Sequence, residues 1–126
     1  MIELYTAPTP NGRKVSIALE EYAVAYSVKA VDLQKNEQFE PDFLKMNLNN
    51  KIPVIFDSDR GSALAESGAI LIYLAEKYGA FWGEDRLETI QWLMWQMGGL
   101  GPMLGQVHYF SRYNSGKSVY AEERFK

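Results

Sequence analysis

The chain of 126 residues contains no cysteine and a single histidine, His108. Without cysteine it forms no disulfide, no thiolate zinc site, no iron–sulfur cluster and no cysteine nucleophile of its own. A metal site around one histidine would need carboxylates for all its other ligands, so we expect no bound metal. Any thiol chemistry must therefore use a sulfur atom supplied by another molecule.

Positive charge and long apolar runs are also scarce. Lys and Arg number 13 against 16 Asp and Glu, which gives a formal net charge of -3 and no general attraction for nucleic acid. The longest strongly apolar stretch, residues 69–75, is far shorter than the roughly 20 residues that cross a bilayer. Residues 1–10 lack the basic and apolar blocks of a signal peptide. We therefore expect a cytoplasmic protein with no nucleic-acid partner and no membrane partner.

The composition that is present suits a globular domain, with 47% hydrophobic and 23% charged residues. Residues 2–5 form a short apolar run that predicts a buried strand, and turn-forming residues follow it. A helix is predicted from Asn11 or Gly12 to about residue 23, and a second strand over residues 26–31. Strand, helix and strand within about 30 residues favour a parallel pair joined by a right-handed crossover. The apolar stripe of this helix consists of Val15, Ala18, Leu19 and Tyr22.

The following segment continues the alternation of helix and strand. Residues 41–46 predict a short helix, residues 52–56 a strand and residues 63–65 its antiparallel hairpin partner. Ser67 is expected to cap a buried helix that ends at Tyr78, before a glycine. The resulting order β-α-β-α-β-β-α is that of the thioredoxin fold, an α/β architecture.

Two domains are predicted, an α/β thioredoxin-like domain over residues 1–80 and an all-α region from residue 81 onward. Helices are expected over residues 85–107 and from residue 119 to the end, with no further strand pattern. Two helices leave many aromatic side chains without a covering layer. We therefore expect residues 81–126 to be the beginning of a larger all-α domain, or to be completed by another chain.

The thioredoxin order brings polar residues to one edge of the sheet. Thr9 and Asn11 stand where the first strand meets the first helix, and the helix N–H groups and dipole favour an anion such as a thiolate there. Capping alone is the alternative, because these residue types are favoured at any helix start. Pro53 follows Ile52 at the start of a strand. It cannot donate to a sheet, so it marks an edge or a bond, cis included, that turns the preceding backbone outward.

Glu66 and Ser67 stand at the start of the last helix of this domain. A hydroxyl and free helix N–H groups bind a carboxylate, and an adjacent acid holds an amine. The pair therefore fits the head group of an α-amino acid, with plain helix capping as the alternative.

Four segments together resemble the glutathione transferase superfamily: residues 4–12, 49–54, 66–74 and 92–103. The similarity is closest to the bacterial Nu-class, which includes glutathione-dependent disulfide-bond oxidoreductases, and it covers essentially all of the chain. The Glu-Ser pair and the Ile-Pro step occur across the superfamily, whereas the Thr-Pro-Asn-Gly turn and the glycine-rich Trp/Met helix are more specific to this branch. The resemblance implies that the C-terminal helical domain is truncated in this chain.

The resemblance also implies a role for each candidate residue. Thr9 and Asn11 would face the sulfur of glutathione as the catalytic residues. Glu66 and Ser67 would hold the γ-glutamyl amine and carboxylate. The Ile52 backbone, exposed by a cis proline, would pair with the cysteinyl part of the peptide. The implied glutathione-binding residues are Asn11, Gln38, Lys51, Ile52, Pro53, Glu66 and Ser67.

Other classes of this superfamily place a tyrosine, serine or cysteine against the sulfur. Tyr5 is therefore an alternative sulfur contact, although its strand pattern favours a packed role. The implied function is a homodimeric, glutathione-dependent enzyme that reduces disulfides or conjugates electrophiles, with glutathione as cosubstrate. Two alternatives stay open: a non-catalytic glutathione-binding or regulatory module, and an inactive fragment of a transferase.

Overall fold

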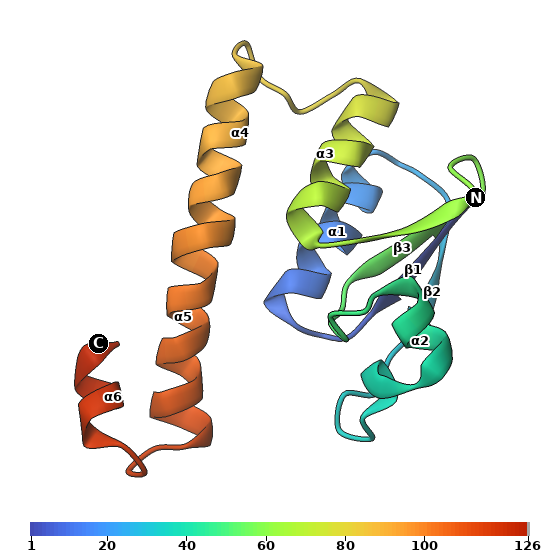
Figure 1. Cartoon of the computed structure of the whole chain (residues 1–126). Helices are drawn as coiled ribbons and strands as arrows, with labels where there is room; N and C mark the ends of the chain where they lie inside the picture. The colour runs from blue at the N-terminus through green and yellow to red at the C-terminus, as the bar shows by residue number, and fades with distance from the viewer. Residues whose placement is uncertain (126) are drawn as a thin grey trace. The chain divides into compact units, whose positions relative to one another are not determined.

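The computed structural model describes residues 1–125 and divides into two units, of which the second begins at Trp82. The first unit contains a four-stranded sheet with helices on both of its faces (Figure 1). Its elements are β1 (Ile2–Thr6), α1 (Pro10–Glu21), β2 (Tyr26–Ala30), a 3-10 turn (Glu37–Phe39), α2 (Pro41–Met46), β3 (Val54–Asp57), β4 (Ser62–Ala65) and α3 (Ser67–Tyr78).

The sheet has the strand order β2-β1-β3-β4. β1 and β2 run parallel, with Ile2 opposite Tyr26, whereas β3 runs antiparallel to both β1 and β4. Together with the helix order this is the thioredoxin-like arrangement, which confirms the fold class predicted from the sequence. The parallel pair and the antiparallel hairpin were both predicted correctly.

Apolar side chains form a cluster on each face of the sheet. α1 and α3 cover one face, and α2 lies on the other (Figure 1). On the α2 face the buried residues are Val31, Phe43 and Val54, with Tyr5 and Ile52 packed against them. On the α1 and α3 face they are Ile2, Leu4, Val15, Leu19, Ile55, Ile70 and Leu74.

Gly12 fixes how closely α1 approaches the end of β1. A Cβ atom at this position would lie 2.3 Å from Thr6 Oγ1 and 2.4 Å from the carbonyl oxygen of Ala7. No side chain fits there, so the first turn of α1 is held directly against the chain that leaves the sheet. The helix ends at Glu21, before the predicted end near residue 23, because Ala23 adopts a left-handed conformation with φ of 52°.

The bounds of α3 match the prediction, and Gly79 ends the helix in the left-handed region with φ of 70°. The predicted capping role of Ser67 is wrong. Glu66 occupies the cap position, also with a positive φ of 70° and with no side-chain cap hydrogen bond, and Ser67 is the first helical residue. The third strand begins at Val54 instead of residue 52, since Pro53 has no N–H to donate to a ladder.

The described residues of the second unit contain helices joined by short loops and no strand. α4 (Arg86–Trp95) and α5 (Gly101–His108) form one continuous helix through a π turn at Gln96–Leu100 (Figure 1). A second π turn (Tyr109–Tyr113) carries this helix beyond the predicted end at residue 107, because no helix-breaking residue occurs before the Asn114-Ser115-Gly116 turn. α6 (Val119–Arg124) follows. Within residues 1–125, no helix is both long and apolar enough to cross a membrane.

Large apolar side chains of the second unit are mostly exposed. Trp92 and Trp95 are 56% and 54% exposed, with their ring centroids 5.7 Å apart in an edge-to-face contact. Ala121 is the one buried apolar residue among the described residues of this unit. These helices therefore enclose almost no core of their own.

Asp57 lies at the end of β3 and is fully buried. Its carboxylate accepts hydrogen bonds from Tyr73 Oη at 2.8 Å, Lys77 Nζ at 2.5 Å and the Asp59 N–H at 3.1 Å. The Met1 ammonium lies 3.8 Å away. Burial raises the pKa of Asp57, but the bonds from Lys77, the Asp59 N–H and Tyr73 outweigh it and hold the pKa below its ordinary value. Hydrogen bonds to the two aspartates raise the pKa of Lys77.

Candidate functional site

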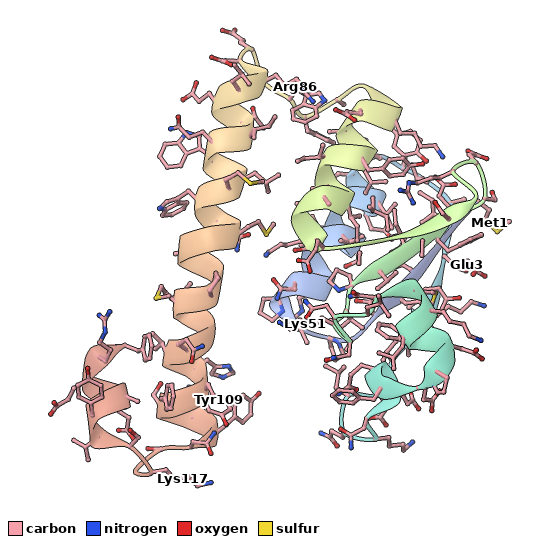
Figure 2. All side chains as sticks on the ribbon, in the orientation of Figure 1. Met1, Glu3, Lys51, Arg86, Tyr109 and Lys117 are labelled. Atoms are coloured by element: carbon pink, nitrogen blue, oxygen red, sulfur yellow. The ribbon has the colours of Figure 1, made fainter. Side chains whose placement is uncertain are left out.

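The sheet register brings three loops to one end of the first unit. Tyr5 near the end of β1 pairs with Val54 at the start of β3, which in turn pairs with Ala65 at the end of β4. The start of α1, the loop before β3 and the start of α3 therefore emerge at the same end. Lys51 lies at this end of the sheet and Met1 lies at the opposite end (Figure 2). The predicted pairs Thr9 and Asn11, Ile52 and Pro53, and Glu66 and Ser67 are all carried by these loops.

Thr9 is the N-cap residue of α1. Its Oγ1 accepts a hydrogen bond from the Gly12 N–H at 3.1 Å, which satisfies one of the free donors of the helix start. A hydroxyl has one hydrogen to donate, and among the described residues no acceptor is found for that of Thr9. Thr9 therefore both caps the helix and keeps a hydrogen-bond donor beside it, so the capping and functional interpretations are compatible.

Asn11 is exposed in the first turn of α1, and its Oδ1 accepts a hydrogen bond from Lys14 Nζ at 2.8 Å. Since an ammonium group can only donate, it engages the oxygen of the amide and leaves the NH2 group as the remaining end. Both predicted sulfur contacts, Thr9 and Asn11, thus have an oxygen already occupied and a donor remaining. Lys14 was not predicted as a site residue, although its i,i+3 spacing from Asn11 on a helix was the available signal.

Asn47 organises the loop that carries Lys51 and Ile52, and it was not predicted as a site residue. Its buried side chain donates from Nδ2 to the Lys51 carbonyl at 2.7 Å and accepts the Asn49 N–H at 3.0 Å. The Asn50 N–H donates to the Asn47 carbonyl at 3.0 Å. The run of asparagines before the Ile-Pro step was the signal, because asparagine side chains commonly close turns by bonding nearby backbone.

The Ile52–Pro53 peptide bond is cis. The Ile52 side chain packs against the apolar cluster on the α2 face, which anchors this part of the loop. Within the described residues no hydrogen bond is found for the Ile52 backbone N–H and C=O. Lys51 is exposed in the adjacent position.

Gln38 lies in the 3-10 turn between β2 and α2. Its Oε1 is buried and has no hydrogen-bond partner within the described residues. The surrounding loop is closed by carboxylates, because Asp32 Oδ1 accepts the Gln34 and Lys35 N–H groups and Glu37 Oε2 accepts the Asp32 N–H. A buried acceptor without a partner costs free energy, so this oxygen suits a donor from a ligand.

Glu66 and Ser67 mark the start of α3, in different environments. The Glu66 side chain is exposed, whereas Ser67 is buried. The Glu66 carbonyl accepts the Ile70 N–H at 2.9 Å, the first bond of the helix. The N–H groups before this bond have no acceptor within an α-helix itself. The first turn contains no acidic residue after the cap position, so the helix dipole favours an anion at this end of α3.

The alternative sulfur contact, Tyr5, is directed elsewhere. Its hydroxyl donates to Glu3 Oε2 at 3.2 Å, two residues back along β1 and away from the candidate site. Burial, followed by the hydrogen bond to the Glu3 carboxylate, raises the pKa of Tyr5. The ring packs beside Phe43 and Val54, which is the packed role that the strand pattern favours.

His108 contacts an aromatic ring, with its centroid 4.9 Å from that of Tyr113. Among residues 1–125 there is no group of three or more His, Asp and Glu side chains that could hold a metal ion. The candidate site therefore offers hydrogen-bond donors on Thr9 and Asn11, the backbone of Ile52 and the carboxylate of Glu66.

Comparison with known families identifies this arrangement. The family described as "Glutathione S-transferase, N-terminal domain" matches residues 1–76, more than half of the chain. The chain belongs to the glutathione S-transferase family. Among curated proteins, this glutathione S-transferase chain is 52% identical to the disulfide-bond oxidoreductase YfcG of Escherichia coli K12, in an alignment that covers all of the chain and 62% of that protein.

Solved structures of the glutathione S-transferase family superpose closely on the chain. A family member from Pseudomonas fluorescens Pf-5, solved with two glutathione molecules, matches with a TM-score of 0.90 and 48% identity. A glutathione transferase from Pseudomonas putida, solved with one glutathione disulfide per subunit, matches with a TM-score of 0.89 and 45% identity. Each alignment covers 98% of this chain, and 59% and 58% of those proteins, so the chain spans less than two thirds of these relatives.

Proposed function

We propose that this chain is the glutathione-binding part of an enzyme that activates the glutathione thiolate, and that it belongs to the Nu-class branch of its family. The observation that carries the proposal is the meeting of three loops at one end of the sheet, beside two helix starts. Among residues 1–125, the Ile52 backbone there has no hydrogen-bond partner. The specific Thr-Pro-Asn-Gly turn at the start of α1 supports the branch.

Each part of the tripeptide has a complementary group in the site. The carboxylate of the γ-glutamyl head group fits the Ser67 hydroxyl and the start of α3, and its amine fits the exposed Glu66 carboxylate. The cysteinyl amide fits the Ile52 backbone beside Pro53, which has no hydrogen bond to any other described residue. The remaining polar groups, on Lys51 and Gln38, would hold the rest of the peptide.

The sulfur would lie near Thr9 and Asn11 at the start of α1. A free thiol has a pKa near 8.5, so only about 3% is thiolate at pH 7. A hydrogen bond to a charged group contributes about 1.5–3 kcal/mol, and the helix start adds about 0.3–1 kcal/mol. Since about 1.4 kcal/mol corresponds to one pKa unit, donors from these two residues are sufficient to make the thiolate the main form near neutrality.

Disulfide reduction is the favoured reaction. The bound thiolate attacks one sulfur of the substrate disulfide, forms a mixed disulfide and releases the other sulfur as a thiolate, which takes up a proton. A second glutathione thiolate then attacks the mixed disulfide and yields glutathione disulfide and the second thiol. Both sulfurs of the couple come from ligands because the chain has no cysteine. The name of the E. coli relative and the ligands of the two Pseudomonas structures support this choice over conjugation to an electrophile.

The same proposal includes a cytoplasmic location and a homodimer. A glutathione-dependent reductase needs a reduced glutathione pool, which the cytoplasm supplies. The exposed aromatic side chains of the second unit, Trp92 and Trp95 among them, support association with a second copy.

Turnover of hydroxyethyl disulfide with glutathione, together with glutathione binding by calorimetry, tests the proposal. We expect the wild-type chain to bind glutathione and to turn over. The double variant Thr9→Ala, Asn11→Ala should retain binding and lose about 10- to 100-fold in kcat, because two donors to the thiolate are removed. Ser67→Ala should weaken binding itself.

Ser16→Ala is a suitable control, since its hydroxyl donates to the Arg13 carbonyl at 3.2 Å on the same helix and to no other group among residues 1–125. Glutathione binding without turnover would favour a binding module and contradict the enzyme proposal. Absence of binding in a folded chain would favour an inactive fragment and contradict the site as well.

A further inference from the structure

Lys14 is a charged residue on α1 that forms a hydrogen bond with Asn11, one of the two predicted sulfur contacts. Its Nζ donates to Asn11 Oδ1 at 2.8 Å across one turn of α1. The side chain is half-buried, and this burial lowers the pKa of Lys14 from its ordinary value. The ammonium group is therefore held at the helix start and is not a fully solvated surface charge.

We propose that Lys14 is a positioning residue that fixes the Asn11 amide with its NH2 group toward the bound sulfur. A free amide can present either its oxygen or its nitrogen, and an oxygen facing a thiolate would repel it. Because the ammonium group binds only the oxygen, it selects the orientation in which Asn11 donates. Its positive charge also favours the thiolate over the thiol. This inference rests on the proposed function.

The remaining charged groups at this end of the first unit do not substitute for Lys14. Arg13 on α1, Lys51 before β3 and Glu66 before α3 are all exposed, and no contact of any of them with Asn11 is found among the described residues. Arg13 and Lys51 add positive charge and Glu66 negative charge, so their fields partly cancel. Removal of Lys14 therefore breaks a bond to Asn11 that none of these three groups makes among the described residues.

Three variants of the full chain separate the roles of the bond and the charge. Lys14→Met removes both, Lys14→Gln keeps a neutral donor, and Lys14→Arg keeps donor and charge. The probe is reduced glutathione, and the readout is the absorbance of its bound thiolate near 240 nm against pH. We expect the thiol pKa to rise by about one unit in Lys14→Met, which is about a tenfold loss of thiolate below the pKa. The thiol pKa in Lys14→Gln should lie between the values for Lys14→Met and wild type, and the thiol pKa in Lys14→Arg should equal that of wild type.

Lys117→Met is the matched control, because Lys117 Nζ donates to Asn114 Oδ1 at 3.0 Å with the same i,i+3 spacing in the second unit. An unchanged thiol pKa in Lys14→Met, with binding retained, would overturn the inference and leave the proposed function intact. An equal change in Lys117→Met would also overturn it. If Lys14→Met does not fold, Lys14→Gln decides by the same titration. Failure of wild type to bind glutathione would instead refute the proposed function.

Discussion

The two ends of the four-stranded sheet handle polar groups in opposite ways. At the end of the sheet that holds the turn between β3 and β4, the buried Asp57 carboxylate accepts hydrogen bonds from Tyr73, Lys77 and the Asp59 backbone. At the other end, the Ile52 backbone and Gln38 Oε1 have no hydrogen-bond partner within the described residues. Both ends belong to the same small core, so the difference is not one of overall packing.

This contrast separates stability from binding in one domain. Polar groups that are buried and fully paired contribute to the stability of the fold and have no donor or acceptor left for a ligand. Groups without a partner in the chain can still form hydrogen bonds with a ligand. Substitutions at the Asp57 end should therefore change the free energy of unfolding with little effect on glutathione binding. Substitutions at the Thr9 end should do the reverse, except where they disturb the backbone that carries the site.

The largest expected effect is on stability, for Asp57→Asn. Removing the charge of a fully buried carboxylate leaves Lys77 with one carboxylate partner and should lower the free energy of unfolding by about 3 kcal/mol. Urea denaturation measures this loss, and calorimetry should show unchanged glutathione affinity in the folded variant. Asp59→Asn is the control, because this carboxylate is largely exposed and should contribute far less. Equal losses for the two variants would contradict the special role of the Asp57 end.

Gly12→Ala should affect both properties. A Cβ atom would collide with Thr6 Oγ1 and the Ala7 carbonyl, so the start of α1 must move, at a cost of about 2 kcal/mol. The same movement displaces Thr9 and Asn11, so catalysis should fall more than stability alone explains. Gly105→Ala in α5 is the control, since nothing lies within 4 Å of its Cβ position, and it should be neutral or slightly stabilising. A Gly12→Ala chain with normal turnover would separate the helix start from the catalytic function.

Asn47→Ala tests whether the loop before β3 is held in place for binding. Loss of its two side-chain hydrogen bonds should cost about 1–2 kcal/mol of stability and weaken glutathione binding, because Lys51 and Ile52 are no longer fixed. Asn49→Ala offers a comparison in the same loop, as only its backbone N–H takes part in this network. Thermal unfolding and calorimetry measure the two effects. Loss of stability with unchanged affinity would show that the loop does not depend on Asn47 for binding.

The smallest effect is the dependence of stability on pH. The pKa of Asp57 is lower in the folded chain than its ordinary value near 3.9, so the folded state holds this proton less tightly than the unfolded state does. The stability from this group is fully present above about pH 4 and is lost as the pH falls through the folded pKa. Urea midpoints between pH 3 and pH 6 should fall at the acid end for wild type, and less steeply for Asp57→Asn. If the urea midpoints of wild type and Asp57→Asn fall equally with pH, Asp57 is not the source of the pH dependence of stability.

The fold could be read from the sequence because local patterns and tertiary structure agree. Alternating apolar residues, turn formers and Gly79 at a helix end each indicate the same thioredoxin-like order that the structure has. The residues at the candidate site were likewise placed by short motifs at element boundaries. The sequence could not reveal that Glu66, with its positive φ, takes the cap position and leaves Ser67 inside the helix.

Contacts between residues distant in sequence escaped prediction for a physical reason. Two of the donors to Asp57, Tyr73 and Lys77, come from a helix 16 and 20 residues later, and no local periodicity indicates such contacts. Asn47 differs, because its partners lie within four residues and the run of asparagines was a local signal for it. Long-range polar networks depend on the assembled core, so they become visible only in the three-dimensional structure.

The π turns at Gln96–Leu100 and Tyr109–Tyr113 alter the angular phase of the long helix. Each wider turn adds about one residue, which rotates every later side chain by roughly 100° relative to an uninterrupted α-helix. A helical wheel drawn continuously from Arg86 would assign residues beyond Leu100 to the wrong direction. Substitutions meant for one side of this helix must therefore be counted separately in α4, in α5 and after His108, with the phase reset at each wide turn.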